Sequence, residues 1–278
     1  MSGSYWKQIH ADGLAVPSDR PLDDLTAELT RMLGSTDPAL RDGTAYPTLV
    51  TWVERGVYDD LLSGLGDGMA AGLRVGIGES GTDSVFRRSF SVLILAECIE
   101  RDNGRPLLAG GKILEWGDRL TTWLLRERDL RGFVPGKGWA HAVAHGADVL
   151  GALAASEAMG RLELTVLLDV VADRLAARTD DRLVHGEDDR LAAATMAVLR
   201  RNVLGPEVVE PWLVRVAESA VHSYDGTRDP FLVTGNVQAY LRALHLQLAL
   251  APYPPGHRAD LLLALIALLK KVNPHYLG

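Results

Sequence analysis

Residues 162–175, with the sequence LELTVLLDVVADRL, decide the fold class. Their apolar side chains, Leu162 and Val166 among them, recur at intervals of three and four residues, which is the spacing of one face of an α-helix. The same spacing continues along nearly the whole chain, for example at Leu25 and Leu29. The alternation typical of β-strands does not persist beyond a few residues. The sequence therefore predicts an all-α protein.

Glycine, proline, asparagine and aspartate residues divide this helical pattern into about eleven segments. Proline follows several of the breaks, where its missing N–H group costs a first helical turn nothing. The predicted helices are residues 22–33, 38–55, 58–75, 83–102, 106–127, 138–159, 162–178, 188–202, 206–222, 230–250 and 256–271.

The connections between these helices are short, so successive helices are expected to be antiparallel neighbours. A long row of such pairs favours an α-solenoid, a HEAT-like or armadillo-like stack. No sequence repeat is visible at the expected period, so a globular bundle and a closed α/α toroid stay open as alternatives. No linker divides the chain. Residues 1–20 are therefore predicted to be an N-terminal tail and residues 21–278 a single helical domain.

The composition excludes several classes of function. The chain of 278 residues has 29 basic and 36 acidic side chains, a net charge of −7, and no basic cluster, which argues against a nucleic-acid partner. A single cysteine, Cys98, excludes an intrachain disulfide and fits a reducing compartment. The longest apolar run, residues 261–269, is about half of what a membrane-spanning helix needs, and no signal peptide is recognised. We therefore expect a soluble, cytoplasmic protein with no membrane partner.

Residues 131–148, RGFVPGKGWAHAVAHGAD, are the least ordinary part of the chain. In a helix that begins near residue 138, His141, His145 and Asp148 would share one stripe. Two imidazoles four residues apart and a carboxylate suit zinc, iron, nickel or manganese, so a divalent metal ion is a candidate cofactor. Ala142 stands where the zinc-protease motif has its catalytic glutamate, which argues against a protease of that type.

Two other interpretations of this stripe stay open. Buried histidines often form purely structural hydrogen-bond networks, and a histidine beside a carboxylate can transfer protons without a metal. Lys137 lies in a flexible Gly-Lys-Gly loop before the predicted helix, a position suited to an anion. Lys137 and Trp139 are therefore candidate substrate-binding residues.

A second polar group is HGEDDR at residues 185–190. Glu187 or Asp188 could cap the following helix and interact favourably with its dipole. Either could instead supply a carboxylate to a site shared with the two histidines, which makes both candidate substrate-binding residues.

A third group surrounds Arg87 and Arg88. Asp83 is most simply an N-cap, and Phe86 and Phe90 are most simply core residues. The two arginines cannot face the same way on a helix. The one that turns inward would need carboxylate partners or would bind an anionic ligand. Asp83 and Arg87 are therefore candidate substrate-binding residues.

The leading functional hypothesis is a small-molecule or metal-dependent enzyme. The alternative is a non-catalytic α-solenoid that binds a peptide or protein partner in its groove. No nucleophile elbow, dinucleotide-binding glycine motif or activated cysteine is recognised. For the enzyme we expect the three polar groups to converge on one pocket, with candidate catalytic residues His141, His145, Asp148 and Arg88.

Residues 132–148, supported by residues 83–91 and 186–191, resemble a bacterial family known as domain of unknown function 2785. The resemblance spans about residues 41 to 244. It implies an all-helical protein, and it supplies no activity, cofactor or catalytic residue.

Overall fold

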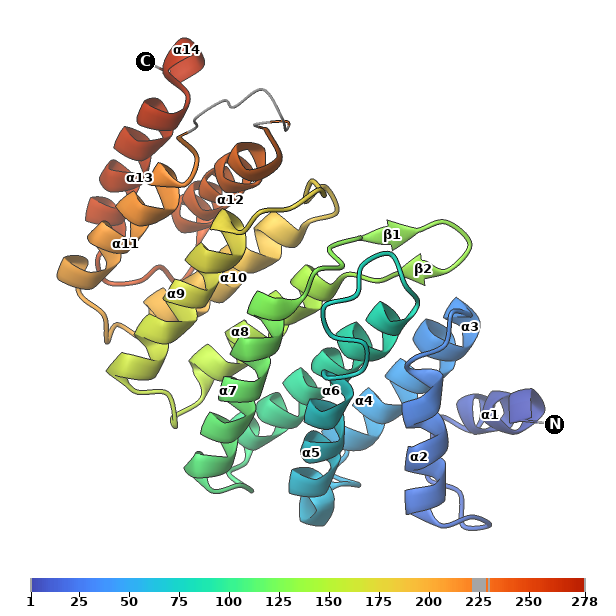
Figure 1. The fold of residues 1–278 in the computed structure, drawn as a ribbon. Coiled ribbons are helices and arrows are strands. Elements are labelled where there is room, and N and C mark those ends of the chain that lie inside the picture. Colours follow the sequence, from blue (N-terminus) through green and yellow to red (C-terminus); the bar gives the residue numbers. More distant parts are fainter. Residues whose placement is uncertain (1, 222–228, 230, 278) are drawn as a thin grey trace. The chain divides into compact units, whose positions relative to one another are not determined.

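The computed structural model describes residues 2–221, 229 and 231–277. Most of these residues are helical, and the strands of the described part are the two-residue β1 (Phe133–Val134) and β2 (Gly138–Trp139) (Figure 1). The all-α prediction is confirmed. The described residues divide into two compact units, one that ends at Gly146 and one that begins at Ala147. The solenoid arrangement and the single-domain assignment stay predictions.

The first unit contains the N-terminal helices, the hairpin and the start of α8 (Ala142–Ala155). Helix α6 packs against α4 and α5, and α5 also packs against α7. A Cβ atom on Gly66 would clash with the ring of Trp116, so glycine is what lets α5 and α7 approach. The elements before α8 are α1 (Ser2–Ala11), α2 (Leu22–Met32), α3 (Pro38–Leu40), a π-helical turn (Arg41–Ala45), α4 (Tyr46–Glu54), a 3-10 turn (Asp59–Leu61), α5 (Leu62–Gly72), α6 (Ser84–Gly104) and α7 (Gly110–Arg126).

Helix α1 occupies part of the segment predicted as a tail. Its Trp6 is buried, and the Trp6 indole N–H donates to a carboxylate oxygen of Glu28 in α2 at 2.9 Å. The Trp6 ring also lies 6.4 Å from the ring of Trp52 in α4. Burial of a large aromatic side chain is what holds this short helix against the unit.

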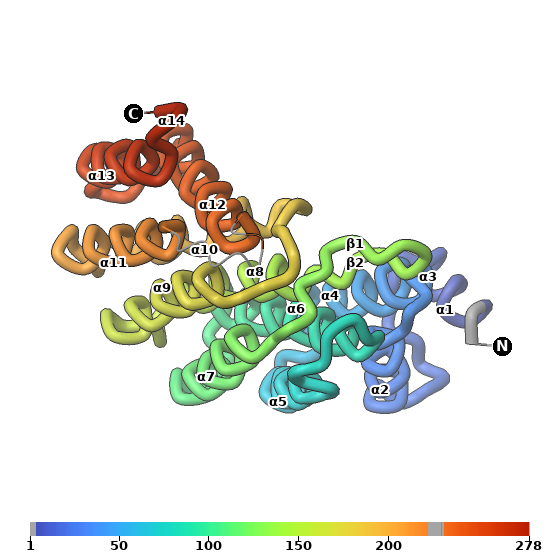
Figure 2. Tube along the Cα trace, turned by 45° about the horizontal axis from the view of Figure 1, so that its top comes forward, coloured from blue at the N-terminus to red at the C-terminus, as the bar shows by residue number. Residues whose placement is uncertain are grey.

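The second unit continues from α8 to the C-terminal helices. Helix α12 packs against α10 and α13, and α11 packs against α9 and α13. Inside this unit the hydroxyl groups of Thr195 and Tyr240 are 2.7 Å apart, and burial raises the pKa of Tyr240. Figure 2 follows the order of these helices along the chain. They are α9 (Arg161–Ala176), α10 (Glu187–Arg200), α11 (Pro206–Glu218), α12 (Phe231–Leu250), α13 (Arg258–Val272) and α14 (Pro274–Leu277).

The stretch at residues 162–175 is helical as predicted. The structure buries Leu164 and Leu168 but leaves Leu162 and Val166 exposed. Apolar residues cover more of the circumference of α9 than its neighbours cover, so periodicity alone does not tell which of them are buried.

The helix predicted to begin at residue 138 begins instead at Ala142. Gly136 and Gly138 have φ angles of +75° and +78°, which allow the chain to turn back as a hairpin. The backbone N–H groups of Ala140 and His141 then donate to the carbonyl oxygens of Gly132 and Arg131. These bonds hold the segment in the hairpin rather than in a first helical turn.

Among the helices that the structure describes, none is long and apolar enough to cross a membrane.

Candidate functional site

A buried ion pair between Arg88 and Glu127 joins the elements around the hairpin. Both side chains are fully buried, and the guanidinium meets the carboxylate through two bonds of 2.6 and 2.8 Å. Arg88 also donates to the carbonyl oxygens of Val75 and Gly76, and Glu127 also accepts from the indole N–H of Trp123. All three guanidinium nitrogens are thus engaged inside the protein. Arg88 turns inward and finds a carboxylate, the first of the two options that the sequence left open.

A second buried acid, Asp129, ties the loop before α6 to the hairpin. Its carboxylate accepts from the backbone N–H of Gly81 at 3.0 Å and from the guanidinium of Arg131 at 2.6 and 2.8 Å. Arg131 donates in turn to the carbonyl oxygen of Thr82. The loop before α6 and the segment that leads into the hairpin therefore lie side by side, as Figure 1 shows, and charged hydrogen bonds connect them.

Arg41 holds the tip of the hairpin from the other side, and the sequence did not single it out as a site residue. Its side chain is fully buried, with the guanidinium carbon 4.3 Å from the ring centre of Phe86 and 4.9 Å from that of Phe90. It donates to the carbonyl oxygens of Ser35 and Lys137, each at 2.7 Å. The sequence signal was available in Phe86 and Phe90, whose spacing predicts one face on which a cation can lie.

Lys137 forms an ion pair with Asp83 at 2.6 Å, and both side chains are exposed at the surface. Asp83 stands at the N-cap position of α6, but its carboxylate makes no capping hydrogen bond there. The N-cap position expected for Asp83 is confirmed, but its carboxylate binds the lysine of the hairpin and does not cap the helix.

Three rings form an aromatic cluster on the hairpin. Trp139 lies parallel to His141, with ring centres 4.3 Å apart and planes inclined by 20°, and Phe133 meets Trp139 edge-on at 5.0 Å. Phe133 is 48% exposed and Trp139 is 40% exposed, whereas His141 is 7% exposed. We call Phe133, Trp139 and His141 the hairpin cluster. The other five tryptophans of the chain are buried.

His141 has an unusual backbone conformation for a non-glycine residue. Its φ angle is +50°, in the left-handed region, and its carbonyl oxygen accepts from the N–H of His145 at the start of α8. Such a conformation costs on the order of 1–3 kcal/mol and is concentrated at functional sites. The helical stripe that the sequence predicted therefore does not include His141, which lies just outside α8.

His145 lies beneath the cluster and is buried. Its ring centre is 5.8 Å from that of His141 and 5.2 Å from that of Phe90. The Nδ1 atom is 3.2 Å from the carbonyl oxygen of Ser89. A carbonyl oxygen can only accept, so Nδ1 carries the proton and Nε2 is the basic nitrogen of the neutral ring.

This assignment predicts an NMR result. At pH 8, where an ordinary imidazole is neutral, the long-range nitrogen–proton spectrum should show His145 as the Nδ1–H tautomer. His257, at an exposed position, serves as the comparison and should show the Nε2–H form that free imidazoles favour. An Nε2–H pattern for His145 would contradict the assigned hydrogen bond.

The predicted residues of the second unit have partners of their own. Asp148 forms an ion pair with Arg190 at 2.7 Å. Glu187 is buried and accepts from the backbone N–H of His185 at 2.8 Å, while Asp188 is half-buried. Asp148, Glu187 and Asp188 belong to the second unit, and His141 and His145 belong to the first. The expected convergence of these residues on one pocket therefore stays a prediction.

Arg87 points to a different neighbour from Arg88, as its helical position requires. Its guanidinium donates to the carbonyl oxygen of Thr30 in α2, and burial lowers the pKa of Arg87. Within the first unit the structure therefore brings together Asp83, Lys137, Trp139, His141 and His145 around the hairpin, with Arg88 as a support and Arg87 apart from them.

No group of three or more His, Cys, Asp or Glu side chains is arranged to hold a metal ion within the residues that the structure describes. The predicted metal site at His141, His145 and Asp148 thus receives no support. The cysteine is equally unsuited to chemistry, because burial raises the pKa of the Cys98 thiol.

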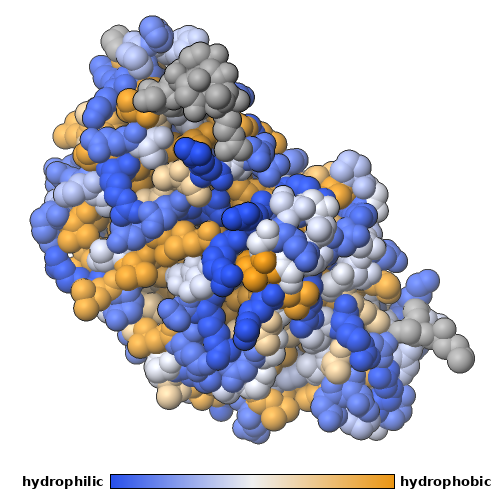
Figure 3. Space-filling model, viewed as in Figure 1, coloured by the Kyte–Doolittle hydropathy of each residue, from blue (hydrophilic) through white to orange (hydrophobic). Residues whose placement is uncertain are grey.

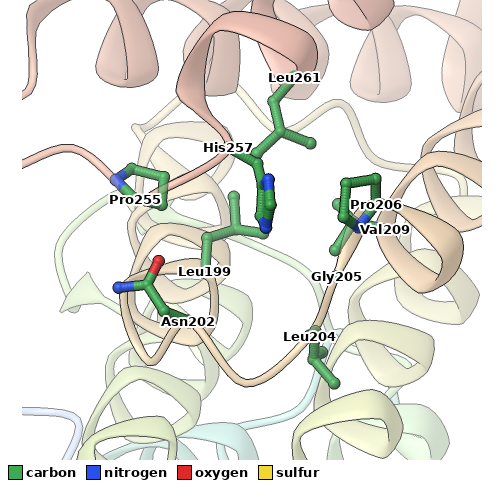
Figure 4. Close-up of a pocket in the computed structure, with 9 residues that line it drawn as sticks. All are labelled: Leu199, Asn202, Leu204, Gly205, Pro206, Val209, Pro255, His257 and Leu261. Atoms are coloured by element: carbon green, nitrogen blue, oxygen red, sulfur yellow. The ribbon is translucent and has the colours of Figure 1, made fainter.

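A small cleft in the second unit contains none of the predicted residues (Figure 4). Leucine, valine and proline side chains form most of its wall, and its polar residues are Asn202 and His257. The amide oxygen of Asn202 already accepts from the backbone N–H of Gly256 at 2.7 Å. This leaves the cleft with little chemistry to offer a ligand.

Comparison with protein families finds a match to a family described as protein of unknown function (DUF2785), over residues 73–246. The match covers more than half of the chain and includes every site residue predicted from the sequence. The resemblance is confirmed, and the matched region begins at residue 73 rather than near 41, so Arg41 lies outside it. No curated protein and no solved structure matches the chain.

Proposed function

The chain belongs to this family of proteins of unknown function, and on that premise we propose that it binds a small molecule with a planar ring at the hairpin cluster. The observation that carries the proposal is the parallel stack of the half-exposed Trp139 on the nearly buried His141. Exposed aromatic clusters on a rigid frame are typical of binding sites.

The frame around the cluster supports this proposal. The hairpin and the loop before α6 are held by charged side chains. These are the Arg88–Glu127 pair, the Arg131–Asp129 pair and Arg41. Buried charges of this kind are costly to arrange and fix the geometry of what they support. A preorganised surface binds a ligand with less loss of conformational entropy.

The chemistry of the cluster suggests what the ligand carries. One face of the Trp139 ring is covered by His141, so a planar ring would stack on its exposed part. Lys137 lies in the same hairpin and could exchange its bond with Asp83 for an anionic group of the ligand. His141 and His145 would then transfer protons in any reaction, without a metal ion.

Three small probes test the proposal: benzoate, benzamide and cyclohexanecarboxylate. Trp139 is the accessible tryptophan, so its fluorescence should account for most of the quenching by acrylamide. We expect benzoate and benzamide to protect Trp139 from acrylamide, and cyclohexanecarboxylate to protect it several-fold less, because it cannot stack. Lys137→Ala should weaken the binding of benzoate and leave that of benzamide nearly unchanged.

Matched variants separate stacking from folding. His141→Phe keeps a ring beneath Trp139 and should retain the binding of benzamide, whereas His141→Ala should lose it. Tyr253→Ala removes an exposed aromatic ring elsewhere and should change nothing. If neither planar probe protects Trp139 at millimolar concentration, or if calorimetry shows that both bind to Trp139→Ala as they bind to the unaltered chain, the hairpin cluster is not the binding site.

The enzyme and the peptide-binding solenoid are finer hypotheses than this proposal. A solenoid groove and a pocket shared with Glu187 and Asp188 both depend on the arrangement of the two units. Both stay predictions, as does the bound metal ion.

A further inference from the structure

Helix α13 contains the longest apolar run of the sequence, and the second unit covers only one side of it. Leu261 and Leu265 are buried against α11 and α12. On the opposite side Leu263 is 66% exposed and Ile266 is 42% exposed, and Ala259 and Ala267 are exposed too. In Figure 3 hydrophobic side chains appear along the edge where Figure 1 places this helix.

These exposed residues form one stripe. Leu263 follows Ala259 by four residues, and Ile266 and Ala267 follow Leu263 by three and four, so the four residues share the outward face of α13. A helix that is apolar on all sides is normally buried on all sides. The outward face therefore has the composition of an interface.

The stripe has opposite charges at its two ends. Asp260 lies in the first turn and Lys270 in the last turn. Both are exposed, and among the described residues neither side chain forms an ion pair. The neighbouring Lys271, by contrast, is directed to Glu218 of α11.

This order of residues is complementary to itself. If a second copy of α13 lies antiparallel across a twofold axis at residue 265, each residue faces the one whose number brings the sum to 530. Leu263 then faces Ala267 of the other copy, a large side chain against a small one. Asp260 of each copy faces Lys270 of the other. The two contacts between these residues lie about 15 Å apart along the helices, because ten residues separate positions 260 and 270.

We propose that two copies of this chain associate through the outward faces of α13 in this antiparallel register. A partner for this face would have to place a basic group opposite Asp260, an apolar stripe opposite Leu263, and an acidic group opposite Lys270. An antiparallel copy of α13 places these groups at the required spacing. The twofold arrangement also buries the same patch on both copies, as the commonest dimers do.

The expected dimer is weak. A helix of 15 residues is about 22 Å long, and a contact between two such helices is smaller than a standard interface. Monomer and dimer should therefore both be populated when the protein is at micromolar to millimolar concentration. Sedimentation velocity over that range should show the mass rise from 30.1 kDa toward twice that value.

Leu263→Glu tests the apolar stripe. It should hold the chain at the monomer mass at every concentration, because it places two carboxylates in the dimer contact. Leu162→Glu replaces another exposed leucine, on α9, and is the matched control; this variant should associate as the unaltered chain does.

A charge exchange tests the register. Asp260→Lys and Lys270→Asp each set like charges against one another, so each alone should raise the dissociation constant by about tenfold or more. When the two variants are mixed, both contacts join opposite charges, and the mixture should associate as the unaltered chain does. Circular dichroism of each variant checks that α13 stays folded.

The unaltered chain remaining monomeric up to 1 mM would overturn the proposal. So would a dimer that survives Leu263→Glu, which would place the contact on another surface. Failure of the mixed charge variants to associate, although the unaltered chain does, would overturn the antiparallel register.

Discussion

We expect Arg88→Met to lower the free energy of unfolding by about 3–5 kcal/mol. The substitution removes the guanidinium that forms two hydrogen bonds to the buried carboxylate of Glu127, and with it the positive charge of this ion pair. It also removes the donors to the carbonyl oxygens of Val75 and Gly76. Urea denaturation followed by circular dichroism measures the loss.

The double variant Arg88→Met with Glu127→Leu is compared with the single variant Arg88→Met. Because both charges are then removed, it should recover a substantial part of the stability that the single variant loses. Arg215→Met, which breaks exposed ion pairs with Asp169 and Asp173, is the control and should cost less than about 1 kcal/mol. A cost for Arg88→Met as small as that of the control would show that the buried pair does not support the hairpin.

The second large effect is expected at Arg41. Its replacement by alanine removes two bonds to carbonyl oxygens and the contact with the rings of Phe86 and Phe90, and it leaves a cavity. The free energy of unfolding should fall by about 3 kcal/mol or more. The hairpin also loses its bond through the Lys137 carbonyl, so the response of Trp139 to acrylamide should change with it.

Arg41→Lys separates charge from shape. A lysine keeps the positive charge but cannot donate to two carbonyl oxygens in a fixed plane while it lies on two rings. We expect it to restore less than half of the loss. Full recovery by lysine, or no effect of Arg41→Ala on the accessibility of Trp139, would contradict the role assigned to Arg41.

The sequence predicted the helices well and the hairpin poorly. Helical spacing is a local property, so the segment at 83–102 corresponds closely to α6, and the segment at 206–222 begins where α11 begins, its last residue lying outside the described residues. The start of α8 was placed four residues too early, because alanine and histidine at 140–142 are compatible with a helix. What prevents it are bonds from Ala140 and His141 to residues 131 and 132, which the local pattern does not reveal.

The candidate site shows the same division. That Arg87 and Arg88 point to different neighbours follows from helical geometry, and the sequence determined it, as it determined the all-α fold. Three features of the site could not be predicted in this way. The pairing of Arg88 with Glu127 and that of Lys137 with Asp83 join segments 39 and 54 residues apart. The stack of Trp139 on His141 depends on the hairpin turn. Helices form from contacts between near neighbours, which a sequence displays directly. Partners across loops are chosen by how the helices pack, and only the tertiary structure decided them.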